Sequence, residues 1–390
     1  MIACRPSRLP GSFASARKAA RVVALALVLG LPAFSAAQTP PASEPPGAVT
    51  PLPAAGESPG AAFPVPAPPS PPQPPPREIA LVLPLTSATY GRAAEAVKAG
   101  FEAAAERARV KPLVIAHGDG EVVAAMTRAR DAGAVVIVGP LVRDDLKAVA
   151  AAEVALPWII ALNQLDDGAP LPYHMYALTL TVESDGRQLA RYLRRNDARN
   201  VAVIVGDSPL QKRLAAAFVD EWLELGGGPP STERLDRDPQ ALVRLKQRMA
   251  KTPPDAVLLA TDVADAAFVR PYLGTLPACA GSQIDDRQPP QLVRDLAGVC
   301  FIEIPWLADP DAPAFAQLKH PSLGNAALDR LYALGIDAFR IAQAIQDGPI
   351  DRLDFDGATG RLTLDDTRVF AREGRVLTYS GGVIEPAEGR

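Results

Sequence analysis

The pattern of apolar and polar residues changes its period within residues 79–108. Residues 79–85 are almost wholly apolar and do not alternate, which is typical of a strand covered on both faces of a parallel sheet. Polar Thr86 and Ser87 follow. From Tyr90 onward, apolar residues recur with the period of a helix and charged residues occupy the opposite face. This order predicts a strand, a short loop and an amphipathic helix, which together form the first half of a βαβ unit.

The same alternation of strand and helix continues in two blocks. The first block has predicted strands at 79–85, 112–116, 134–138, 157–162 and 175–180, with helices at 90–108, 121–132 and 143–154. The second has predicted strands at 201–205, 256–260, 276–280 and 299–304, with helices at 185–195, 210–225, 240–249 and 264–273. Such regularity predicts parallel sheets with right-handed crossovers. We therefore predict an α/β protein of two lobes, residues 78–181 and 182–305, each a parallel sheet flanked by helices, with crossings near Thr181 and Pro305.

The C-terminal part of the chain changes character twice. Residues 325–345 predict one long helix with no strand of its own, and we expect residues 306–350 to pack back on the first lobe. Polar turns separate short strands at 361–364 and 368–371, which predicts a β-hairpin. We place the tail, residues 351–390, with the second lobe.

Residues 1–37 have the composition of an export signal. Five basic residues and no acidic residue accompany the apolar run Val22–Leu31, which small Ser35, Ala36 and Ala37 follow. The apolar run is too short to span a bilayer well. We expect cleavage here and a periplasmic location for the remainder.

Residues 38–77 hold an unusual share of the prolines, because 16 of the 41 fall between Pro40 and Pro76. With few charges and almost no large apolar side chains, this stretch cannot bury enough surface to offset the entropy of ordering. We expect a disordered, extended tether. The alternative is that it serves as a polyproline ligand for a partner.

The charge of the remaining chain bounds its partners. Removing residues 1–37 leaves 35 Lys and Arg against 44 Asp and Glu, a net charge of −9. An acidic body argues against binding nucleic acid or anionic lipid surfaces. The apolar share of 48% excludes global disorder.

The cysteines leave two interpretations open. Cys4 lies in the export signal, and Cys279 and Cys300 lie on predicted strands. In an oxidising compartment these two could form a disulfide, or they could be two buried free thiols. Neither has a second Cys or His at ligand spacing, so we expect no metal site.

No catalytic motif is recognisable. Hydrolase elbow, phosphate-loop and HExxH patterns are absent from the sequence, and Gly118-Asp119-Gly120 lacks the third glycine of a dinucleotide-binding loop. Three scattered histidines and two Asp pairs, at 285–286 and 365–366, have no positioned nucleophile near them in sequence. We therefore expect neither enzymatic activity nor a cofactor.

Short polar side chains follow several predicted strands. Because ligands of open α/β sheets bind at the carboxyl ends of the strands, these residues are candidates for lining a cleft between the lobes and binding a small polar ligand. The same residue types also cap helices, and this alternative stays open for each of them. The candidates are Ser87, Thr89, Asp119, Asn163 and Ser184 on one side, and Asp207, Ser208, Asp262 and Ser282 on the other. Trp158 and Trp306, which follow prolines, fit either core packing or a wall of the cleft.

The order of the elements resembles the type I periplasmic-binding-protein fold, and local strings are more specific. The strings IALVLPLTSATYGRAAEAVKAGF, VIVGPLVRDDL, WIIALNQL, RLYALGIDAFRIAQAI and FDGATGRLTLDDTRVFAR are similar to the LppC-type penicillin-binding protein activators over residues 78–385. The resemblance implies a non-catalytic regulator that binds a bifunctional penicillin-binding protein, a peptidoglycan synthase, and raises its activity. The alternative is a periplasmic receptor for a small amino-acid-like or peptide ligand.

The sequence departs from that family in two places. Members usually carry a lipid-modified cysteine directly after the apolar run, where this chain reads Phe34-Ser35-Ala36-Ala37-Gln38, so we expect no lipid anchor at this position. The best-known members also have a helical-repeat domain before this one, whereas here the proline-rich stretch precedes it.

Overall fold

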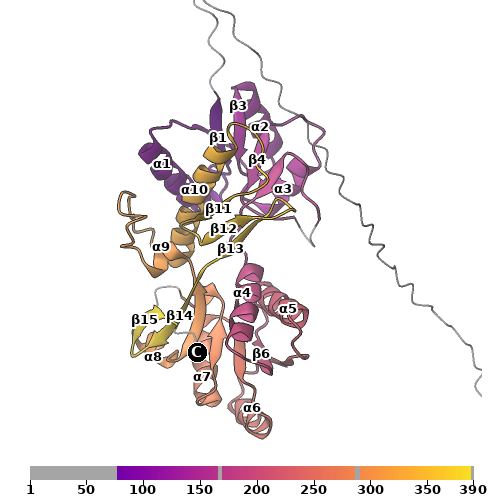
Figure 1. Cartoon of the computed structure of the whole chain (residues 1–390), viewed down its shortest axis with the longest axis vertical. Helices are drawn as coiled ribbons and strands as arrows, with labels where there is room; N and C mark the ends of the chain where they lie inside the picture. Colours follow the sequence, from indigo (N-terminus) through magenta and orange to yellow (C-terminus); the bar gives the residue numbers. More distant parts are fainter. Residues whose placement is uncertain (1–76, 166–168, 286–289, 388–390) are drawn as a thin grey trace, which may run out of the picture. The chain divides into compact units, whose positions relative to one another are not determined.

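The computed structural model describes residues 77–165, 169–285 and 290–387 of the 390-residue chain. The predicted export signal, the tether up to Pro76 and Asp286 of the first Asp pair lie outside these residues. The elements follow in this order (Figure 1): β1 (Glu78–Leu83), α1 (Gly91–Ala108), β2 (Leu113–Ala116), α2 (Val122–Asp131), β3 (Ala134–Val138), α3 (Arg143–Ala150), β4 (Trp158–Ala161), β5 (Met175–Ala177), α4 (Val182–Arg195), β6 (Val201–Val205), α5 (Pro209–Glu224), β7 (Ser231–Arg234), α6 (Pro239–Lys251), β8 (Ala256–Ala260), α7 (Val263–Leu273), β9 (Ala278–Ala280), the 3₁₀ helix η2 (Ser282–Ile284), α8 (Pro290–Asp295), β10 (Val299–Glu303), α9 (Pro305–Ala308), α10 (Ala326–Ile345), β11 (Asp354–Asp356), β12 (Arg361–Leu364), β13 (Phe370–Glu373), β14 (Arg375–Ser380) and β15 (Val383–Pro386).

The first lobe is built on a five-stranded parallel sheet in the order β2-β1-β3-β4-β5. Alternate residues of β1 enter two different cores. Ile79, Leu81 and Leu83 join a core with α1 and α10, and Ala80 and Val82 join a core with α2 and α3. Because helices cover both faces, β1 needs an apolar residue at every position from Ile79 onward, which explains the unbroken apolar run after Glu78.

Helices α1 and α10 approach each other closely at two glycines. A Cβ on Gly100 would lie 1.9 Å from the carbonyl oxygen of Tyr332, and a Cβ on Gly335 would lie 2.0 Å from that of Val97. No larger residue fits at either position without moving a helix, since packed cores do not absorb such overlaps. These glycines therefore fix α10 against the first lobe.

The second lobe is built on a seven-stranded sheet in the order β15-β14-β10-β9-β8-β6-β7. Strands β6 to β10 run parallel, with α4 and α5 on one face and α6 and α7 on the other. At one edge β14 and β15 are antiparallel, so this sheet is mixed rather than wholly parallel. The other edge strand, β7, was not predicted because its sequence, Ser-Thr-Glu-Arg, has no apolar residue.

The C-terminal tail, which we placed with the second lobe, divides between two sheets. Strands β11, β12 and β13 form an antiparallel sheet, and Leu362 and Phe370 are buried in the first-lobe core. After Gly374, β14 pairs with β10, and Leu377 and Tyr379 are buried in the second lobe. Short strands in which apolar and polar residues alternate all have one apolar face. The sequence therefore does not indicate which of the two cores buries that face.

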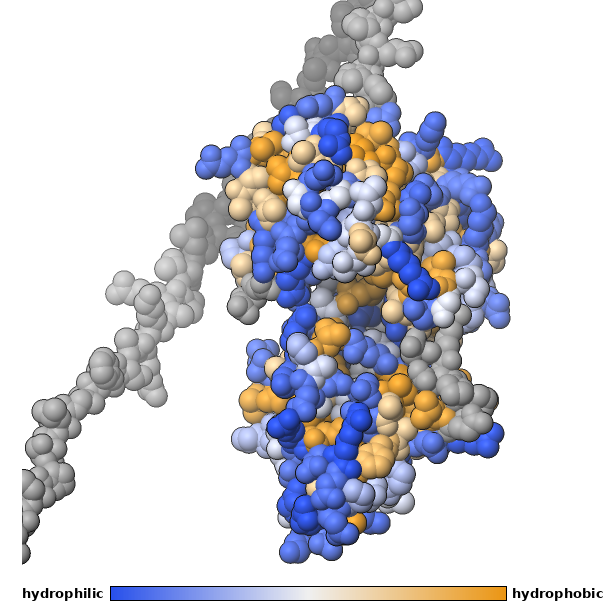
Figure 2. Space-filling view, turned by 180° about the vertical axis from the view of Figure 1, so that it is seen from behind, coloured by the Kyte–Doolittle hydropathy of each residue, from blue (hydrophilic) through white to orange (hydrophobic). Residues whose placement is uncertain are grey.

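In the described ranges, none of the helices has the length and apolar character needed to cross a membrane. On the face shown in Figure 2, hydrophilic residues cover most of the surface and hydrophobic residues form smaller patches. Tyr173 has the largest exposed fraction, 71%, among the exposed large hydrophobic side chains of the described residues.

Candidate functional site

The polar residues predicted at the strand ends of the first lobe take part in local turns or face solvent. The Oγ of buried Ser87 accepts hydrogen bonds of 3.3 and 3.1 Å from backbone N–H groups just before α1. Asn163 donates from Nδ2 to the carbonyl oxygen of Leu141 at 2.9 Å. Thr89 and Asp119 are exposed. Ser87 and Asn163 thus use their polar groups within the first lobe.

Three of the predicted residues line one cavity of the second lobe. Asp207, Ser208 and Asp262 face a space of about 690 Å³ next to the carboxyl ends of β6 and β8. The Oγ of Ser208 accepts from the N–H of Gln211 at 3.2 Å, and Oδ1 of Asp262 accepts from the N–H of Asp265 at 2.9 Å. Both residues are therefore helix caps, of α5 and α7, as well as cavity lining.

Charges of both signs surround this cavity. Arg234 donates to Asp207 through two hydrogen bonds of 2.8 and 2.9 Å, and these bonds lower the pKa of Asp207. Burial raises the pKa of Asp265, which lies 2.7 Å from a guanidinium nitrogen of Arg237. The carboxylates here already accept hydrogen bonds from the protein, and exposed pairs of this kind contribute little to stability.

A buried network lies where the chain crosses between the lobes. Arg372 of β13 donates from Nη2 to Oδ1 of Asp185 on α4 at 2.9 Å, and their side chains are 4% and 2% exposed. Oδ2 of Asp185 accepts from the hydroxyl and the N–H of Ser282 at 2.6 and 3.0 Å. The hydroxyl of Ser184 lies 3.5 Å from the carbonyl oxygen of Arg372. Ser184 and Ser282, both predicted cleft residues, belong to this network.

A second buried ion pair continues the network through Ser282. Arg330 of α10 donates from Nε to Oε1 of Glu303 at 3.0 Å, and from Nη2 to the carbonyl oxygens of Ser282 and Asp285, each at 2.8 Å. The side chain of Glu303 is 1% exposed. Burial raises the pKa of Glu303, and the guanidinium of Arg330 opposes that shift. Each partner compensates a charge that would otherwise be buried alone.

These pairs surround a cavity of about 260 Å³ whose lining comes from both lobes. Two arginines and two acids line it, so their charges balance. The chain crosses between the lobes once more at Gly374, between β13 and β14. There Gln188 donates to the carbonyl oxygen of Gly374 at 2.6 Å and accepts from its N–H at 2.9 Å. The arrangement joins α4, η2, β10, α10 and β13 by internal hydrogen bonds. The cavity lining includes Thr181, Asp185, Ser282, Glu303, Arg330 and Arg372.

Sequence reasoning missed the charged members of this network. Glu303 ends the otherwise apolar string VCFIE, and Asp185 lies one turn inside α4. A charge inside an apolar run was the available signal, because acids are almost never fully buried unless they are paired. The partners lie 27 and 187 residues away, so the sequence alone does not pair them.

Two of the three histidines have contacts within the protein. His320 stacks on Trp306 with ring centroids 4.0 Å apart, and Nδ1 of His117 lies 2.8 Å from the carbonyl oxygen of Gly118. Across the residues that the structure describes, His, Cys, Asp and Glu form no group of three or more that could hold a metal ion. The side chain of Trp306 is buried in the first-lobe core.

The family model described as "LppC putative lipoprotein" matches residues 72–382. This range includes every described helix and every strand except β15. The chain belongs to the LppC family. LpoA from Edwardsiella piscicida, described as a penicillin-binding protein activator, is 27% identical over 309 residues, which cover 68% of this chain and 44% of that protein. This LppC-family chain therefore spans less than half the length of the curated relatives it matches.

Solved structures confirm the fold of this LppC-family chain. The C-domain of LpoA from Haemophilus influenzae, described as a regulator of PBP1A, has a TM-score of 0.69 at 23% identity, covering 80% of this chain and 100% of that one. A "putative branched-chain amino acid ABC transporter" from Chromobacterium violaceum has a TM-score of 0.68 at 33% identity, covering 77% and 99%. The architecture is the predicted two-lobed, type I periplasmic-binding-protein-like α/β fold.

Two of the strings that resemble the LppC family meet in the structure. Asp337, from ALGIDAFR on α10, is wholly buried against the turn GATG between β11 and β12. A Cβ on Gly357 of that turn would lie 2.6 Å from Oδ2 of Asp337, so only glycine fits there. In this LppC-family chain the two strings thus fix the third sheet on α10.

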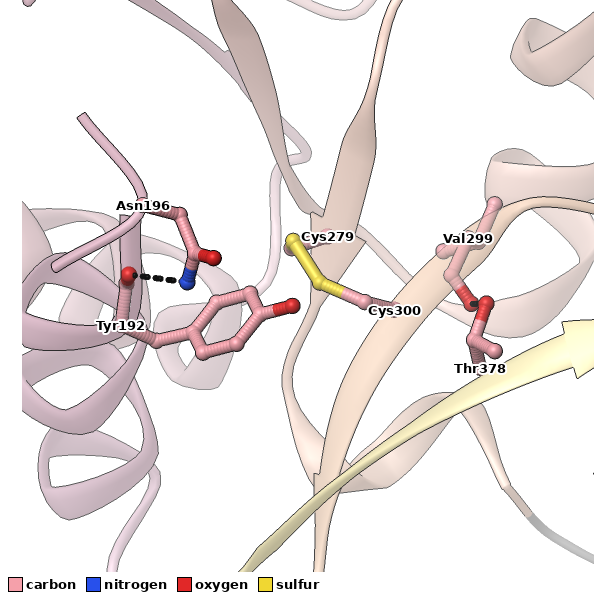
Figure 3. Close-up of a disulfide and its surroundings, with 6 residues drawn as sticks. All are labelled: Tyr192, Asn196, Cys279, Val299, Cys300 and Thr378. Atoms are coloured by element: carbon pink, nitrogen blue, oxygen red, sulfur yellow. Dashed lines mark hydrogen bonds between the residues drawn. A yellow bond between two sulfur atoms is a disulfide. The ribbon is translucent and has the colours of Figure 1, made fainter. Parts of the chain in front are cut away.

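The two cysteines of the second lobe are bonded to each other in the structure. Cys279 on β9 and Cys300 on β10 are direct neighbours in the parallel register and form a disulfide (Figure 3). The ring of Tyr192 on α4 points toward the disulfide in Figure 3. All three residues line a cavity of about 480 Å³ at the amino ends of β9 and β10.

Proposed function

We propose that this LppC-family chain is a non-catalytic periplasmic regulator that binds a bifunctional penicillin-binding protein and raises its peptidoglycan synthase activity. The observation that carries the proposal is the LppC match over residues 72–382, together with relatives described as penicillin-binding protein activators. The network at the crossings supports it, because the charged groups that line the cavity there, Arg330 with Glu303 and Arg372 with Asp185, are already paired within the protein. A regulator that acts through its surface needs no reacting group and no bound ligand.

The proposed periplasmic location rests on two features. Residues 1–37 combine basic residues, a short apolar run and small residues, as export signals do. The pairing of Cys279 with Cys300 suits an oxidising compartment, where disulfides persist.

The decisive experiment measures binding and activation together. The purified full chain, immobilised, is expected to retain a detergent-solubilised bifunctional penicillin-binding protein of the same organism. It is also expected to raise the rate of glycan polymerisation or peptide cross-linking when added to that synthase with lipid-linked substrate. A periplasmic protein of similar size and charge serves as the control. Failure to retain any such synthase, with both rates unchanged, would remove the proposal.

A solute receptor is the second candidate. The structure from Chromobacterium violaceum that is 33% identical is described as a "putative branched-chain amino acid ABC transporter", and the cavity of about 260 Å³ between the lobes offers space for a small ligand. Such a ligand would have to compete with the internal ion pairs for their hydrogen bonds. The candidate ligands are amino-acid-like molecules or short peptides.

Thermal unfolding separates the two candidates. A ligand at 100 times its dissociation constant stabilises the folded state by about 2.7 kcal/mol, which a melting curve resolves easily. The receptor hypothesis expects a raised melting temperature with branched-chain amino acids, short peptides or muropeptides. No shift with any of these removes the receptor, whereas a shift without synthase activation favours it over the regulator.

A further inference from the structure

An aromatic pocket lies at the edge of the first-lobe sheet where the strands begin. Trp158 is the first residue of β4, and its ring centroid lies 5.7 Å from that of Tyr173 and 5.9 Å from that of Tyr176. These three side chains, with Ile350 and Asp351, line a pocket of about 220 Å³. Tyr173 is 71% exposed, so an aromatic face is available to a ligand.

The pocket is held open by contacts of its own. The hydroxyl of Tyr176 donates to the carbonyl oxygen of Ile350 at 3.1 Å and accepts from its N–H at 3.0 Å, which fixes the chain that follows α10. The guanidinium of Arg368 lies 5.2 Å from the ring centroid of Tyr173. Rigid aromatic walls of this kind are the surfaces on which polyproline II segments dock. The remaining lining residues include Pro349, Asp365 and Asp366.

The described chain begins beside this pocket. Nη1 of Arg77 lies 2.8 Å from Oδ1 of Asp347, and the carbonyl oxygen of Arg77 accepts from Nε2 of Gln346 at 2.6 Å. Asp347 precedes Pro349 of the pocket by two residues. The strand pairing independently places the start of β1 near the pocket, because Ile79 pairs with Val136, which pairs with Trp158. Two strand spacings, about 10 Å, therefore separate β1 from Trp158.

The sequence directly before Arg77 is rich in proline, which is the kind of segment that an aromatic pocket binds. Residues 70–76 read Ser-Pro-Pro-Gln-Pro-Pro-Pro. A polyproline II segment rises about 3.1 Å per residue, so residues 71–76 span roughly 19 Å, enough to reach past Trp158. A ligand attached to its own site binds at a high effective concentration, and the fixed φ of proline reduces the entropy lost on docking.

We propose that the pocket of Trp158, Tyr173 and Ile350 binds the chain's own proline-rich segment, residues 71–76. The prolines stack on the aromatic rings, and the ion pair of Arg77 with Asp347 holds the residue that follows the segment beside the pocket. This site is independent of the proposed binding to a synthase. It anchors one end of the proline-rich stretch on the first lobe.

Photo-crosslinking in the full chain tests the occupant. A benzoyl-phenylalanine in place of Gln73 is expected to crosslink within the same chain to residues 157–158, 172–176 or 349–351, located by mass spectrometry. Tyr173→Ala is expected to lower the yield by about fivefold or more, because it removes an aromatic anchor. Tyr90→Ala, an exposed tyrosine on another part of the first lobe, is the matched control and should leave the yield unchanged. Both replaced side chains are exposed, so neither variant should lose its fold.

Tryptophan quenching gives a second measurement. Trp222 and Trp306 are 0% and 4% exposed, so acrylamide quenching of the three tryptophans reports mainly on half-buried Trp158. Replacing the five prolines of residues 71–76 with serine is expected to increase quenching, and Trp158→Phe should abolish the increase. Crosslinks to a second copy, crosslinks scattered over the surface, a yield unaffected by Tyr173→Ala, or unchanged quenching would each overturn the proposal.

Discussion

Asp337 of α10 accepts two hydrogen bonds from Thr359, one from its N–H and one from its hydroxyl, both at 2.7 Å. A third bond of 2.8 Å comes from the N–H of Ala358. Burial raises the pKa of Asp337, while these three bonds oppose the shift by favouring the carboxylate. A single side chain thus accepts hydrogen bonds from three donors of the buried turn that connects β11 and β12 of the third sheet. The stability of that sheet should depend on Asp337.

Asp337→Ala is expected to lower the free energy of unfolding by roughly 3 kcal/mol, because it leaves two buried N–H groups and a hydroxyl without their acceptor. Urea unfolding followed by circular dichroism measures the loss. Asp356→Ala, which removes an exposed carboxylate one residue before Gly357, should change stability by no more than about 0.5 kcal/mol. Equal stability of the two variants would contradict the role given to Asp337.

The main elements could be predicted from the sequence because their patterns are local. The unbroken apolar run of β1 and the long amphipathic pattern of α10 each reflect burial of one element against its neighbours. The predicted helix boundaries differ from the observed ones by a few residues, since capping side chains such as Ser208 and Asp262 set them. Edge strand β7 carries no such pattern and was missed.

The candidate site could be predicted only in part, because side chains of one type serve two purposes. Ser208 and Asp262 lie at the expected strand ends, yet they also cap helices. The pairing of Asp185 with Arg372 follows from tertiary contacts across 187 residues, and composition or spacing does not encode it. Local polarity therefore predicted Ser184 and Ser282, which lie near the crossings. The buried charged side chains that bond to Ser282 could be found only in the structure.

The buried pair Arg330–Glu303 gives a prediction with a defined pH dependence. Arg330→Gln leaves the carboxylate of Glu303 buried without its counter-charge, and we expect a loss of about 3–5 kcal/mol in the free energy of unfolding at neutral pH. Arg361→Gln, which breaks an exposed pair with Asp354, should change the free energy of unfolding little, because solvent screens such a pair. Urea unfolding of both variants at several pH values makes the comparison.

The pH dependence follows from the direction of the Glu303 shift. Burial already raises the pKa of Glu303, and Arg330→Gln removes the guanidinium that opposes the shift. The folded variant then binds more protons than the unfolded chain between the two pKa values, so its stability falls as pH rises through the folded pKa. The deficit should therefore be larger at pH 8 than at pH 5, and it should shrink in the double variant Glu303→Gln/Arg330→Gln. A deficit independent of pH would contradict an ionised Glu303 in the variant.

The disulfide between Cys279 and Cys300 should stabilise the second lobe by closing a loop in the unfolded chain, which lowers the conformational entropy of that state. The two cysteines are 21 residues apart, and closing a loop of that length is worth about 3 kcal/mol. The double variant Cys279→Ala/Cys300→Ala should lose roughly this amount in urea unfolding, which the alanine cavities increase somewhat. Dithiothreitol should destabilise the wild-type chain by a similar amount and leave the double variant unchanged, because only the former has a bond to reduce. If the reductant affects neither protein, the two cysteines are free thiols, and the loss in the double variant measures packing alone.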